Sequence, residues 1–413
     1  MTAADDFTNT AVPVERRVRG INILLTWLGF ILVVASMSFG GGLAAQLSLR
    51  DLVTSILIGN LFLAACGLVA GFVGSQSGLS FGSLAARVFS RGTWRLAILY
   101  IPLVLIGWYA IESSIFGNFI ADTFHLTDIA RRAVMAAAAI FFSISAYIGV
   151  RFIGRVSYIL IPAVLFISAF ALLSVPAGRL QFGFGPSVTN VSVGIGIVMS
   201  TWIFSALLVV PDLTRFVRRP AIGALIGATG VMVGNTLALS IGAFAAAYTK
   251  QSDPSLILVG LGFTPLALIL TFASVWSTND NNMYSSSLSV AKVLGVSRRA
   301  VVLGLAAVGA AIALFNPATI QTMFAFLGFM GASASPLGGI VLGAYLFQRG
   351  AAEPRNSAVA AWLAWGIATF ITLQMKGAYV VPVGVALGCC LWWVINSLIG
   401  AFAGASSKSR DRS

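Results

Sequence analysis

The chain has 413 residues, of which 58% are hydrophobic and only 9% charged, and its mean hydropathy is +0.96. A soluble domain carries about 25% charged residues, so this chain has too little polar surface to stay dispersed in water. Its formal net charge of +13 does not indicate nucleic-acid binding, because the basic residues form short clusters between apolar runs, with no patch interleaved with aromatic residues. The composition predicts a membrane protein and excludes the soluble and nucleic-acid-binding classes.

The apolar runs are long and continuous, without the two-residue alternation of a barrel strand. Because backbone groups in lipid must be satisfied internally, they predict an all-α polytopic protein. A span needs about 20 mainly apolar residues, and twelve are predicted in chain order: 21–45, 52–76, 95–121, 131–149, 155–175, 190–213, 221–248, 257–291, 300–315, 318–347, 357–374 and 379–403. Span eight is too long for one crossing, so it either tilts strongly or begins with a short helix around Pro254–Gly262 that breaks near Pro265.

Basic residues collect on the cytoplasmic side of membrane proteins. In this arrangement one side holds 19 of the 25 Lys and Arg residues, and the other side holds Arg50, Arg131, Arg132, Arg179, Lys250 and Lys376. We therefore expect a multi-pass protein of the cell (inner) membrane with both termini in the cytoplasm. Residues 1–20 and 404–413 would be the two cytoplasmic tails.

Span one contains three consecutive glycines, at positions 40 to 42, after the polar stretch Ala35-Ser36-Met37-Ser38. Glycine is less favourable than alanine inside a helix by up to about 1 kcal/mol, so this run favours an interruption. A broken helix frees backbone carbonyls inside the membrane, where transporters use them to hold ions and substrates. The alternative is a face of small residues that packs closely on another helix.

Span eight contains an unusually polar run from Ser274 to Asn282. Ser274, Ser277 and Thr278 are spaced i, i+3, i+4 and share one helical face, which offers a carbonyl and two hydroxyl oxygens. Oxygen ligands suit a hard cation such as sodium. Bonding of the hydroxyls back to their own helix is the alternative, which the four consecutive polar residues after Thr278 disfavour.

Span three places Gly107, Trp108 and Glu112 in mid-membrane. Tryptophan usually prefers the membrane interfaces, and a flat apolar face with a polar edge suits stacking on a planar ring. The alternative is an ordinary core aromatic residue. Glu112 lies one turn from Trp108, so it faces the same cavity, where it binds substrate, carries a proton or pairs with a neighbour.

Span six is polar and aromatic from Ser200 to Ala206 but has no glycine or proline there to force a break. Asp212 and Arg215, at i and i+3, are expected to form a structural salt bridge near its end. The only histidine, His125, lies in a predicted loop, and the acidic residues within spans are scattered. An enzyme site at a membrane interface is therefore not expected.

The chain resembles the nucleobase–cation symporter family, and its bacterial cytosine permease branch in particular. The matching stretches occur in family order at nearly family spacing across spans one to eight. They are Ala35-Ser36-Met37 with the following glycines, Ile58-Gly59-Asn60-Leu61, Gly78-Leu79-Ser80, Gly107-Trp108, Asp212 with Arg215-Phe216, Gly234-Asn235, and Trp276-Ser277-Thr278-Asn279-Asp280-Asn281. The later spans match mainly in hydropathy.

This resemblance implies a leucine-transporter-type fold, with inverted five-helix repeats at 21–175 and 190–347 and two further helices within 357–403. Spans one and six would both be broken, with the binding site at the bilayer midplane. Trp108 would stack on a heterocyclic base, Phe204 or Trp202 would cover its other face, and Ser205 and Ala206 would add polar contacts. A sodium site would be formed by the carbonyls of Gly29, Leu32 and Ser274 and the hydroxyls of Ser277 and Thr278.

The chain departs from the cytosine permeases at two positions that hydrogen-bond the base in that branch. It has Leu105 where they have glutamine, and Ser274 where they have asparagine. A buried hydrogen-bonding partner discriminates strongly between analogues, so these changes argue against cytosine itself. Glu112 has no acidic counterpart in that branch and would recognise a different donor pattern, as in a purine, a hydroxymethylpyrimidine or another planar nitrogen heterocycle.

We therefore expect a monomeric secondary active transporter that carries a planar heterocycle together with sodium and needs no organic cofactor. Proton coupling through Glu112 or Asp280 is the first alternative. An amino-acid carrier of the same fold, which would bind a zwitterion at broken helix ends, is the second. A receptor on the same scaffold would bind the ligand without moving it.

Overall fold

The computed structural model describes residues 7, 10–176, 183–185, 190–251, 253–347 and 357–410. Arg179, predicted to lie in an outer loop, falls outside the described residues, as do 1–6, 8–9 and 411–413 of the predicted tails. The α-helices are α1 (Ile21–Ile31), α2 (Val34–Ala44), α3 (Leu49–Ser77), α4 (Phe81–Val88), α5 (Ser90–Thr123), α6 (Asp128–Ile148), α7 (Val150–Leu173), α8 (Val191–Phe204), α9 (Val210–Thr214), α10 (Pro220–Thr229), α11 (Thr236–Thr249), α12 (Pro254–Gly260), α13 (Thr264–Leu294), α14 (Arg298–Ala313), α15 (Ile320–Phe347), α16 (Ser357–Leu373) and α17 (Val380–Arg410).

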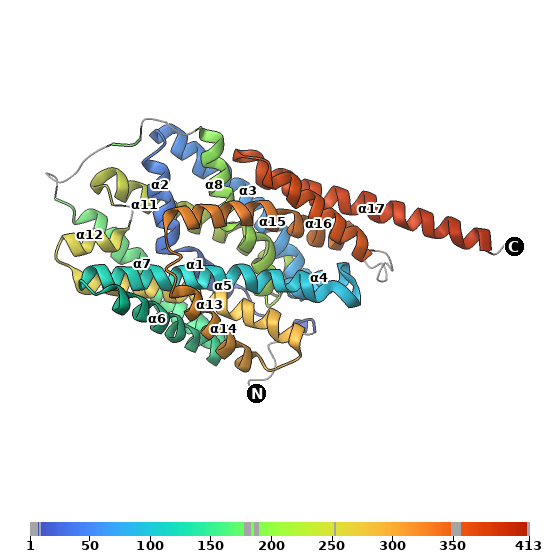
Figure 1. Cartoon of the computed structure of the whole chain (residues 1–413), viewed down its shortest axis with the longest axis horizontal. Coiled ribbons are helices and arrows are strands. Elements are labelled where there is room, and N and C mark those ends of the chain that lie inside the picture. The colour runs from blue at the N-terminus through green and yellow to red at the C-terminus, as the bar shows by residue number, and fades with distance from the viewer. Residues whose placement is uncertain are drawn as a thin grey trace.

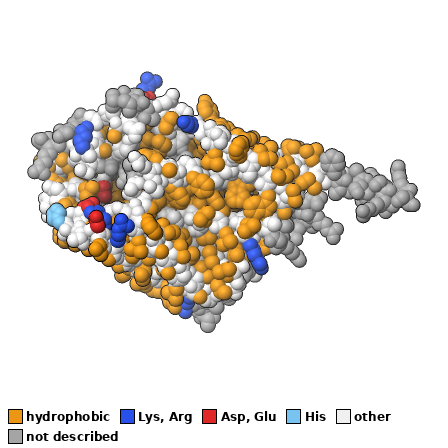
Figure 2. Space-filling model, in the orientation of Figure 1, with side chains coloured by type: hydrophobic (Ala, Val, Ile, Leu, Met, Phe, Trp, Pro, Cys, Tyr) orange, Lys and Arg blue, Asp and Glu red, His pale blue; other side chains and the backbone are white. Residues whose placement is uncertain are grey.

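Each of the twelve segments predicted as spans coincides with helix, and the chain is a multi-pass membrane protein. Within the described residues, seven helices are long and apolar enough to cross a membrane, or nine if each of two bent helix pairs counts as one span. Long helices such as α5, α15 and α17 run along the longest axis of the molecule in Figure 1. Hydrophobic side chains cover much of the face shown in Figure 2, and the few charged ones on it lie mainly toward its margins. This distribution fits a lipid-facing surface.

Small residues let helices in the interior approach one another at backbone distance. Gly67 and Gly71 of α3 face Gly227 and Gly223 of α10, and each pair is spaced four residues apart on its own helix. A Cβ atom on Gly71 would lie 2.2 Å from the Gly223 carbonyl oxygen, and one on Gly227 would lie 2.0 Å from that of Gly67. This is the small-residue packing that holds membrane helices together where lipid removes the hydrophobic driving force between them.

The first span is broken, but not at its glycines. α1 ends at Ile31 and α2 begins at Val34, with a bend of 52° between them. The predicted break at the three glycines is therefore wrong, because α2 continues through them and is held by packing. A Cβ atom on Gly40 would lie 2.0 Å from the Leu239 carbonyl oxygen of α11, so the small-residue alternative describes this stretch correctly.

Two other predicted spans contain irregular segments. In span six, α8 passes into a π-helical segment at Ser205–Val209 and then into α9, so the helix stays continuous where the resemblance implied a break. A π-helical segment is a local widening that often accompanies functional sites. Span eight has the predicted short leading helix: α12 precedes α13, and Pro265 lies in the first turn of α13.

The two ends of the molecule differ in their polar contacts. At the end where α3 and α9 finish, here called the arginine-rich end, the Arg17 guanidinium donates to the carbonyls of Val12 and Ser75. Backbone bonds also join Val18 to Phe216 and Arg218. This N-terminal segment thus ties the ends of α3 and α9 together.

Asp212 and Arg215 lie at the same end and are fully buried. The Arg215 Nε donates to the Asp212 main-chain carbonyl at 3.1 Å, while the Asp212 carboxylate accepts from the Phe81 amide at 2.7 Å. The contact described joins the Arg215 side chain to the main chain of Asp212, and the predicted salt bridge between the two side chains stays a prediction. The Asp212 carboxylate positions α4, a helix that hydropathy did not predict.

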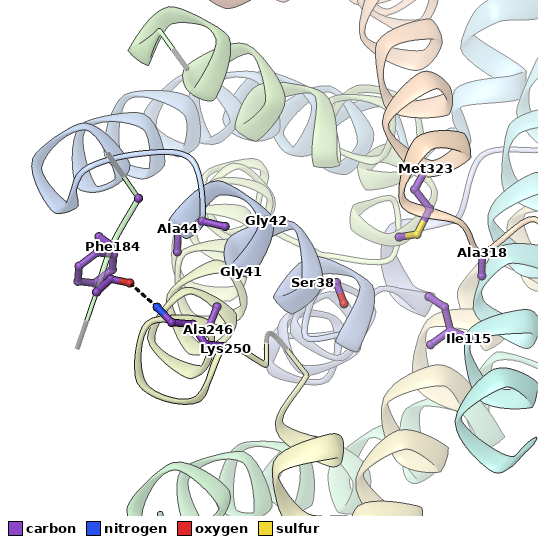
Figure 3. A pocket seen from close by; sticks show the side chains of 13 residues that line it. Ser38, Gly41, Gly42, Ala44, Ile115, Phe184, Ala246, Lys250, Ala318 and Met323 are labelled. Atoms are coloured by element: carbon purple, nitrogen blue, oxygen red, sulfur yellow. Dashed lines mark hydrogen bonds between the residues drawn. The ribbon is translucent and has the colours of Figure 1, made fainter. Parts of the chain in front are cut away.

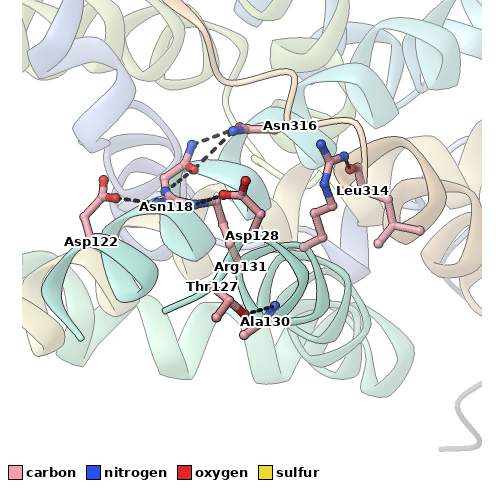
Figure 4. Close-up of polar contacts among 9 residues, drawn as sticks. Asn118, Asp122, Thr127, Asp128, Ala130, Arg131, Leu314 and Asn316 are labelled. Carbon is pink, nitrogen blue, oxygen red and sulfur yellow. Dashed lines mark hydrogen bonds and ion pairs between the residues drawn. The ribbon is translucent and has the colours of Figure 1, made fainter. Parts of the chain in front are cut away.

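The opposite end carries a polar cluster drawn in Figure 4. The side-chain amides of Asn118 and Asn316 donate hydrogen bonds to each other, at 2.9 and 3.2 Å. Arg131 donates to the Asn118 side chain and forms an ion pair with Asp122 at 2.7 Å. These contacts join the end of α5, the start of α6 and the segment between α14 and α15. His125 lies beside this cluster, exposed and in the loop between α5 and α6, as predicted.

Candidate functional site

A small cavity lies in the middle of the molecule and has a volume of about 30 Å³. A cavity needs about 10–15 Å³ to hold one water molecule, so this one has room for two or three waters and no planar ring. Its walls come from α1, α2, α5, the α8 region, α13 and α15. The lining residues are Phe30, Val33, Ala35, Ser36, Phe39, Leu105, Trp108, Glu112, Thr201, Trp202, Phe204, Ser205, Thr278, Asn282 and Met330.

Trp108 of α5 forms one wall and is held by an aromatic cluster. Its ring centroid lies 6.2 Å from that of Phe39 and 5.5 Å from that of Phe326, and its Nε1 donates to the Met330 sulfur at 2.9 Å. Phe39 comes from α2, and Phe326 and Met330 come from α15. Gly107 gives Phe326 room, since a Cβ atom there would lie 2.8 Å from the Phe326 ring. The helix that approaches α5 closely at Gly107 is thus α15.

The end of α8 supplies further aromatic walls. Trp202 donates from Nε1 to the Ser36 hydroxyl at 3.2 Å and packs edge-on against Phe30 at 5.2 Å. Phe204 and Ser205, at the start of the π-helical segment, also line the cavity. Ala206 does not: it is fully buried and is not part of the cavity wall.

Glu112 lies in the same wall as Trp108, one helical turn along α5, as its spacing predicts. Its side chain is 1% exposed, and its Oε2 has no hydrogen-bond partner in the described part of the chain. Leu105 lines the cavity on the other side of Trp108 along the same helix. The cavity therefore combines apolar and aromatic walls with one carboxyl group.

A cluster of oxygens lies where the break between α1 and α2 meets α13. Ser277 donates to the Gly29 carbonyl at 2.9 Å and to the Ser274 carbonyl at 3.0 Å. Thr278 donates to the Phe30 carbonyl at 3.2 Å and to the Ser274 carbonyl at 3.3 Å. Four of the five oxygens predicted to bind sodium are thus brought together.

The fifth predicted oxygen, the Leu32 carbonyl, is replaced in these contacts by that of Phe30. Leu32 caps the C-terminus of α1, where the chain turns toward α2, whereas Phe30 is still within the helix. The cluster contains only neutral oxygens, and a hydroxyl can rotate to offer a lone pair. Neutral oxygens suit a hard cation of low charge, because affinity for divalent ions rises with the number of carboxylate ligands.

Ser274 also has a structural task that its sequence position does not reveal. Its hydroxyl accepts from the Val34 amide at 2.8 Å and so caps the first turn of α2 after the break. The side chain is fully buried and does not line the cavity. The structure therefore places the Ser274 hydroxyl at a helix end, away from the substrate position at which the resemblance put it.

A larger pocket of about 690 Å³ opens at the end opposite the arginine-rich one, and we call it the vestibule (Figure 3). Ser38 of α2 lines the vestibule, and the next residue, Phe39, lines the cavity. On α5, Ile115 lines the vestibule and Glu112 lines the cavity. The vestibule therefore leads toward the cavity. At its rim Lys250 donates to the Gly183 carbonyl at 3.4 Å.

Residues 11–360 match the family model described as permeases for cytosine/purines, uracil, thiamine and allantoin. The chain belongs to this permease family. Its similarity to cytosine permease of Escherichia coli strain K12 spans 96% of this chain and 95% of the relative, at 25% identity. The cytosine permease of Escherichia coli O157:H7 matches to the same extent.

Solved structures agree with this permease in fold. Mhp1, a nucleobase-cation-symport-1 family transporter bound to bromovinylhydantoin in a closed conformation, superposes with a TM-score of 0.79 at 15% identity, covering 93% of each chain. Inward-facing Mhp1 gives 0.75 at 16% identity, covering 96% of this chain and 94% of that one. A sodium-coupled sialic acid symporter gives 0.68 at 13% identity, covering 93% and 90%. These likenesses concern the fold; membership of the permease family is what makes the protein a transporter and not an enzyme.

Several residues of the permease cavity were not predicted from sequence. Ser36, Phe39, Asn282 and Met330 line it. Asn282 belongs to the polar run of span eight and was predicted only to need a partner. Met330 gave no signal, because a methionine in an apolar span looks like any other lipid-facing or core residue.

Proposed function

We propose that this permease is a secondary active transporter that carries a planar nitrogen heterocycle together with sodium by alternating access. The observation that carries the proposal is the overlap of two sites. Phe30 and Thr278 line the aromatic cavity, and the same two residues supply a carbonyl and a hydroxyl to the oxygen cluster between α1 and α13. An ion held there fixes the cavity wall against which the heterocycle binds.

In this proposal Trp108 stacks on one face of the heterocycle and Phe204 or Trp202 covers the other. Sodium is held by the oxygens of Gly29, Phe30, Ser274, Ser277 and Thr278. Sodium joins the break in span one to α13 and so favours the conformation that accepts substrate. Because such coupling is reciprocal, sodium raises the affinity for the heterocycle by the same factor as the heterocycle raises the affinity for sodium.

The same proposal covers the architecture that hydropathy and resemblance suggest. All twelve helical segments cross the membrane, the first ten form two inverted repeats of five, and the arginine-rich end faces the cytoplasm. The vestibule then opens on the outer side of an inner membrane. The protein works as a monomer, since each chain holds a complete cavity.

A thermal-shift experiment on purified protein tests the proposal. Nucleobases and related heterocycles are screened in sodium and in choline, because a ligand that binds the folded state raises its apparent stability. A heterocycle whose shift is larger in sodium supports the proposal. Hits that are indifferent to sodium would remove the sodium assignment, and a response to amino acids alone would remove the heterocycle.

Proton coupling is the second candidate, favoured by Glu112. Its carboxyl group is buried beside the cavity with a partnerless oxygen, and buried carboxyl groups within membranes often mark proton pathways. Substrate uptake driven by a proton gradient in the absence of sodium would favour this candidate.

A further inference from the structure

Glu112 is the one cavity residue with a fully buried polar atom that lacks a partner, among the fifteen that line it. Its carboxyl group makes no hydrogen bond within the part of the chain that the structure describes. Burying an unpaired polar group carries a penalty, and an unpaired charge a far larger one. A ligand that fills the cavity therefore gains most by meeting this group.

Of the other polar side chains that line the cavity, all but Ser205 have a hydrogen-bond partner in the described part of the chain, Asn282 through a bond to Asn279. The Ser36 hydroxyl accepts from Trp202, and the Thr201 hydroxyl donates to the Val198 carbonyl and accepts from Asn235. Thr278 is engaged with carbonyls of α1 and α13. No second ionisable side chain lines the cavity among the described residues.

Apart from the Ser205 hydroxyl, the remaining wall is apolar. Leu105 lies about two turns from Glu112 on α5, and Phe39 and Met330 complete the surface around Trp108. A carbonyl group pointed at this wall would lose its bond to water and gain no new one. The chemistry of these walls therefore matches a flat ring with one hydrogen-bonding edge toward Glu112 and apolar surface elsewhere, once the cavity widens to admit it.

We propose that Glu112 selects amino-substituted heterocycles by pairing with their amidine edge, which is an exocyclic amino group next to a basic ring nitrogen. This inference rests on the proposed function and names the substrate class of that site. The amino group donates one N–H to one carboxyl oxygen, and a single proton is shared between the other oxygen and the ring nitrogen. The pair is neutral overall wherever that proton lies, and no other bond forms or breaks.

Selectivity follows from the oxo analogues of the same rings. In these the amidine edge is replaced by a ring N–H beside a carbonyl, and the carbonyl oxygen faces a carboxyl oxygen. The analogue has no basic ring nitrogen at that edge to take the proton, so it forms only a neutral two-bond pair with the protonated carboxyl group. The amidine edge can take the proton and form a charge-assisted pair, whose hydrogen bonds are roughly twice as strong. We expect the amino member of a matched pair to bind at least about tenfold more tightly.

The experiment measures dissociation constants in sodium for two matched pairs, adenine with hypoxanthine and 4-aminopyrimidine with 4-pyrimidinone. Wild type is compared with Glu112→Gln and Glu112→Leu. Leucine removes both hydrogen bonds, so the difference between amino and oxo members should fall to within about twofold. Glutamine presents amide N–H donors and a carbonyl acceptor but cannot give up a proton, so it should pair with both edges by neutral bonds and the difference between amino and oxo ligands should narrow.

Asp280→Asn is the matched control. Asp280 is also a buried carboxyl residue with a partnerless oxygen, but it contacts Ser145 of α6 and does not line the cavity. Its substitution should leave the amino-to-oxo ratio unchanged. Unfolding temperatures and monodispersity show whether each variant is folded. If the leucine variant does not fold, the isosteric Glu112→Gln variant alone tests whether Glu112 sets the amino-to-oxo ratio.

Equal affinities for amino and oxo members in wild type would overturn the proposal. So would a ratio that survives both Glu112 substitutions. If no heterocycle of either kind binds, the proposed function fails and this inference fails with it. Binding of oxo heterocycles in preference to amino ones would retain the proposed function and reject only the role given to Glu112.

Discussion

At the scale of single residues, Thr278 connects the two halves of the candidate site. Its side chain lines the cavity, and its hydroxyl reaches carbonyls of α1 and of its own helix. Ser277, its neighbour, makes the equivalent contacts to Gly29 and Ser274 without lining the cavity. A substitution at Ser277 can therefore test ion binding alone, whereas one at Thr278 would also change the cavity wall.

Replacing Ser277 with alanine should remove an ion ligand and leave the cavity wall intact. A bond between a hydroxyl and a charged group contributes about 1.5–3 kcal/mol. The sodium concentration that gives half of the full stabilisation should therefore be about 10- to 100-fold higher for this variant than for wild type. Titrating the unfolding temperature with sodium measures this. Ser289→Ala is the control, because Ser289 is a buried serine of α13 that bonds only to its own helix at Ser285; equal sodium responses in the two variants would contradict the ion site.

Replacing Trp108 with leucine should weaken heterocycle binding without changing the sodium response. Aromatic pairs contribute about 0.5–1.5 kcal/mol beyond the area they bury, which corresponds to a two- to tenfold rise in the dissociation constant. Trp393→Leu serves as the control, since Trp393 is 58% exposed and lies on α17 away from the cavity. An unchanged affinity in Trp108→Leu would remove the stacking role.

Sequence reasoning reached those residues whose chemistry stands out in an apolar span. Helical spacing alone placed Ser277 and Thr278 on one face, and one helical turn placed Glu112 beside Trp108. It could not find the Phe30 carbonyl, because a backbone oxygen has no sequence signature, nor Met330, whose contact with Trp108 depends on how α15 crosses α5. The role of Ser274 as a cap of α2 depends on tertiary contact in the same way.

At the scale of helices, close packing decides where the chain bends. The three glycines of span one remain helical, and the first of them, Gly40, packs against the backbone of α11. The break falls eight residues earlier, at Leu32 and Val33. Glycine propensity measures an isolated helix and is overridden when a neighbouring backbone fills the space. The π-helical segment after Phe204 was equally hidden, since it contains neither glycine nor proline.

Placing a methyl group at the crossing of α3 and α10 should destabilise the protein. In Gly227→Ala the new carbon would lie 2.0 Å from the Gly67 carbonyl oxygen, so the helices must separate. Overpacking of this kind is unfavourable by about 1–3 kcal/mol, visible as a lower unfolding temperature. Gly366→Ala is the matched control, because its Cβ would meet open space and alanine favours helix; a similar loss of stability in both variants would show that helix crossing is not the cause.

At the scale of the whole molecule, the distribution of charge predicts orientation. We expect the arginine-rich end in the cytoplasm and the vestibule outside. In a chain whose three cysteines are replaced, Ala318→Cys in the vestibule should react with a membrane-impermeant thiol reagent added to intact cells. Arg218→Cys, exposed at the arginine-rich end, should react only after the membrane is opened; the reverse pattern would invert the topology.

The small volume of the cavity has a consequence for how the transport cycle runs. A carrier that has released its cargo must pass through the closed state again, and a site shaped permanently for a ring would then enclose an empty or water-filled void. Here the cavity has a volume of about 30 Å³, with Met330 and Phe326 packed against Trp108. In the proposed alternating-access cycle, a site that keeps so little empty volume lets the unloaded protein return without a passenger, which favours net accumulation of solute over obligatory one-for-one exchange.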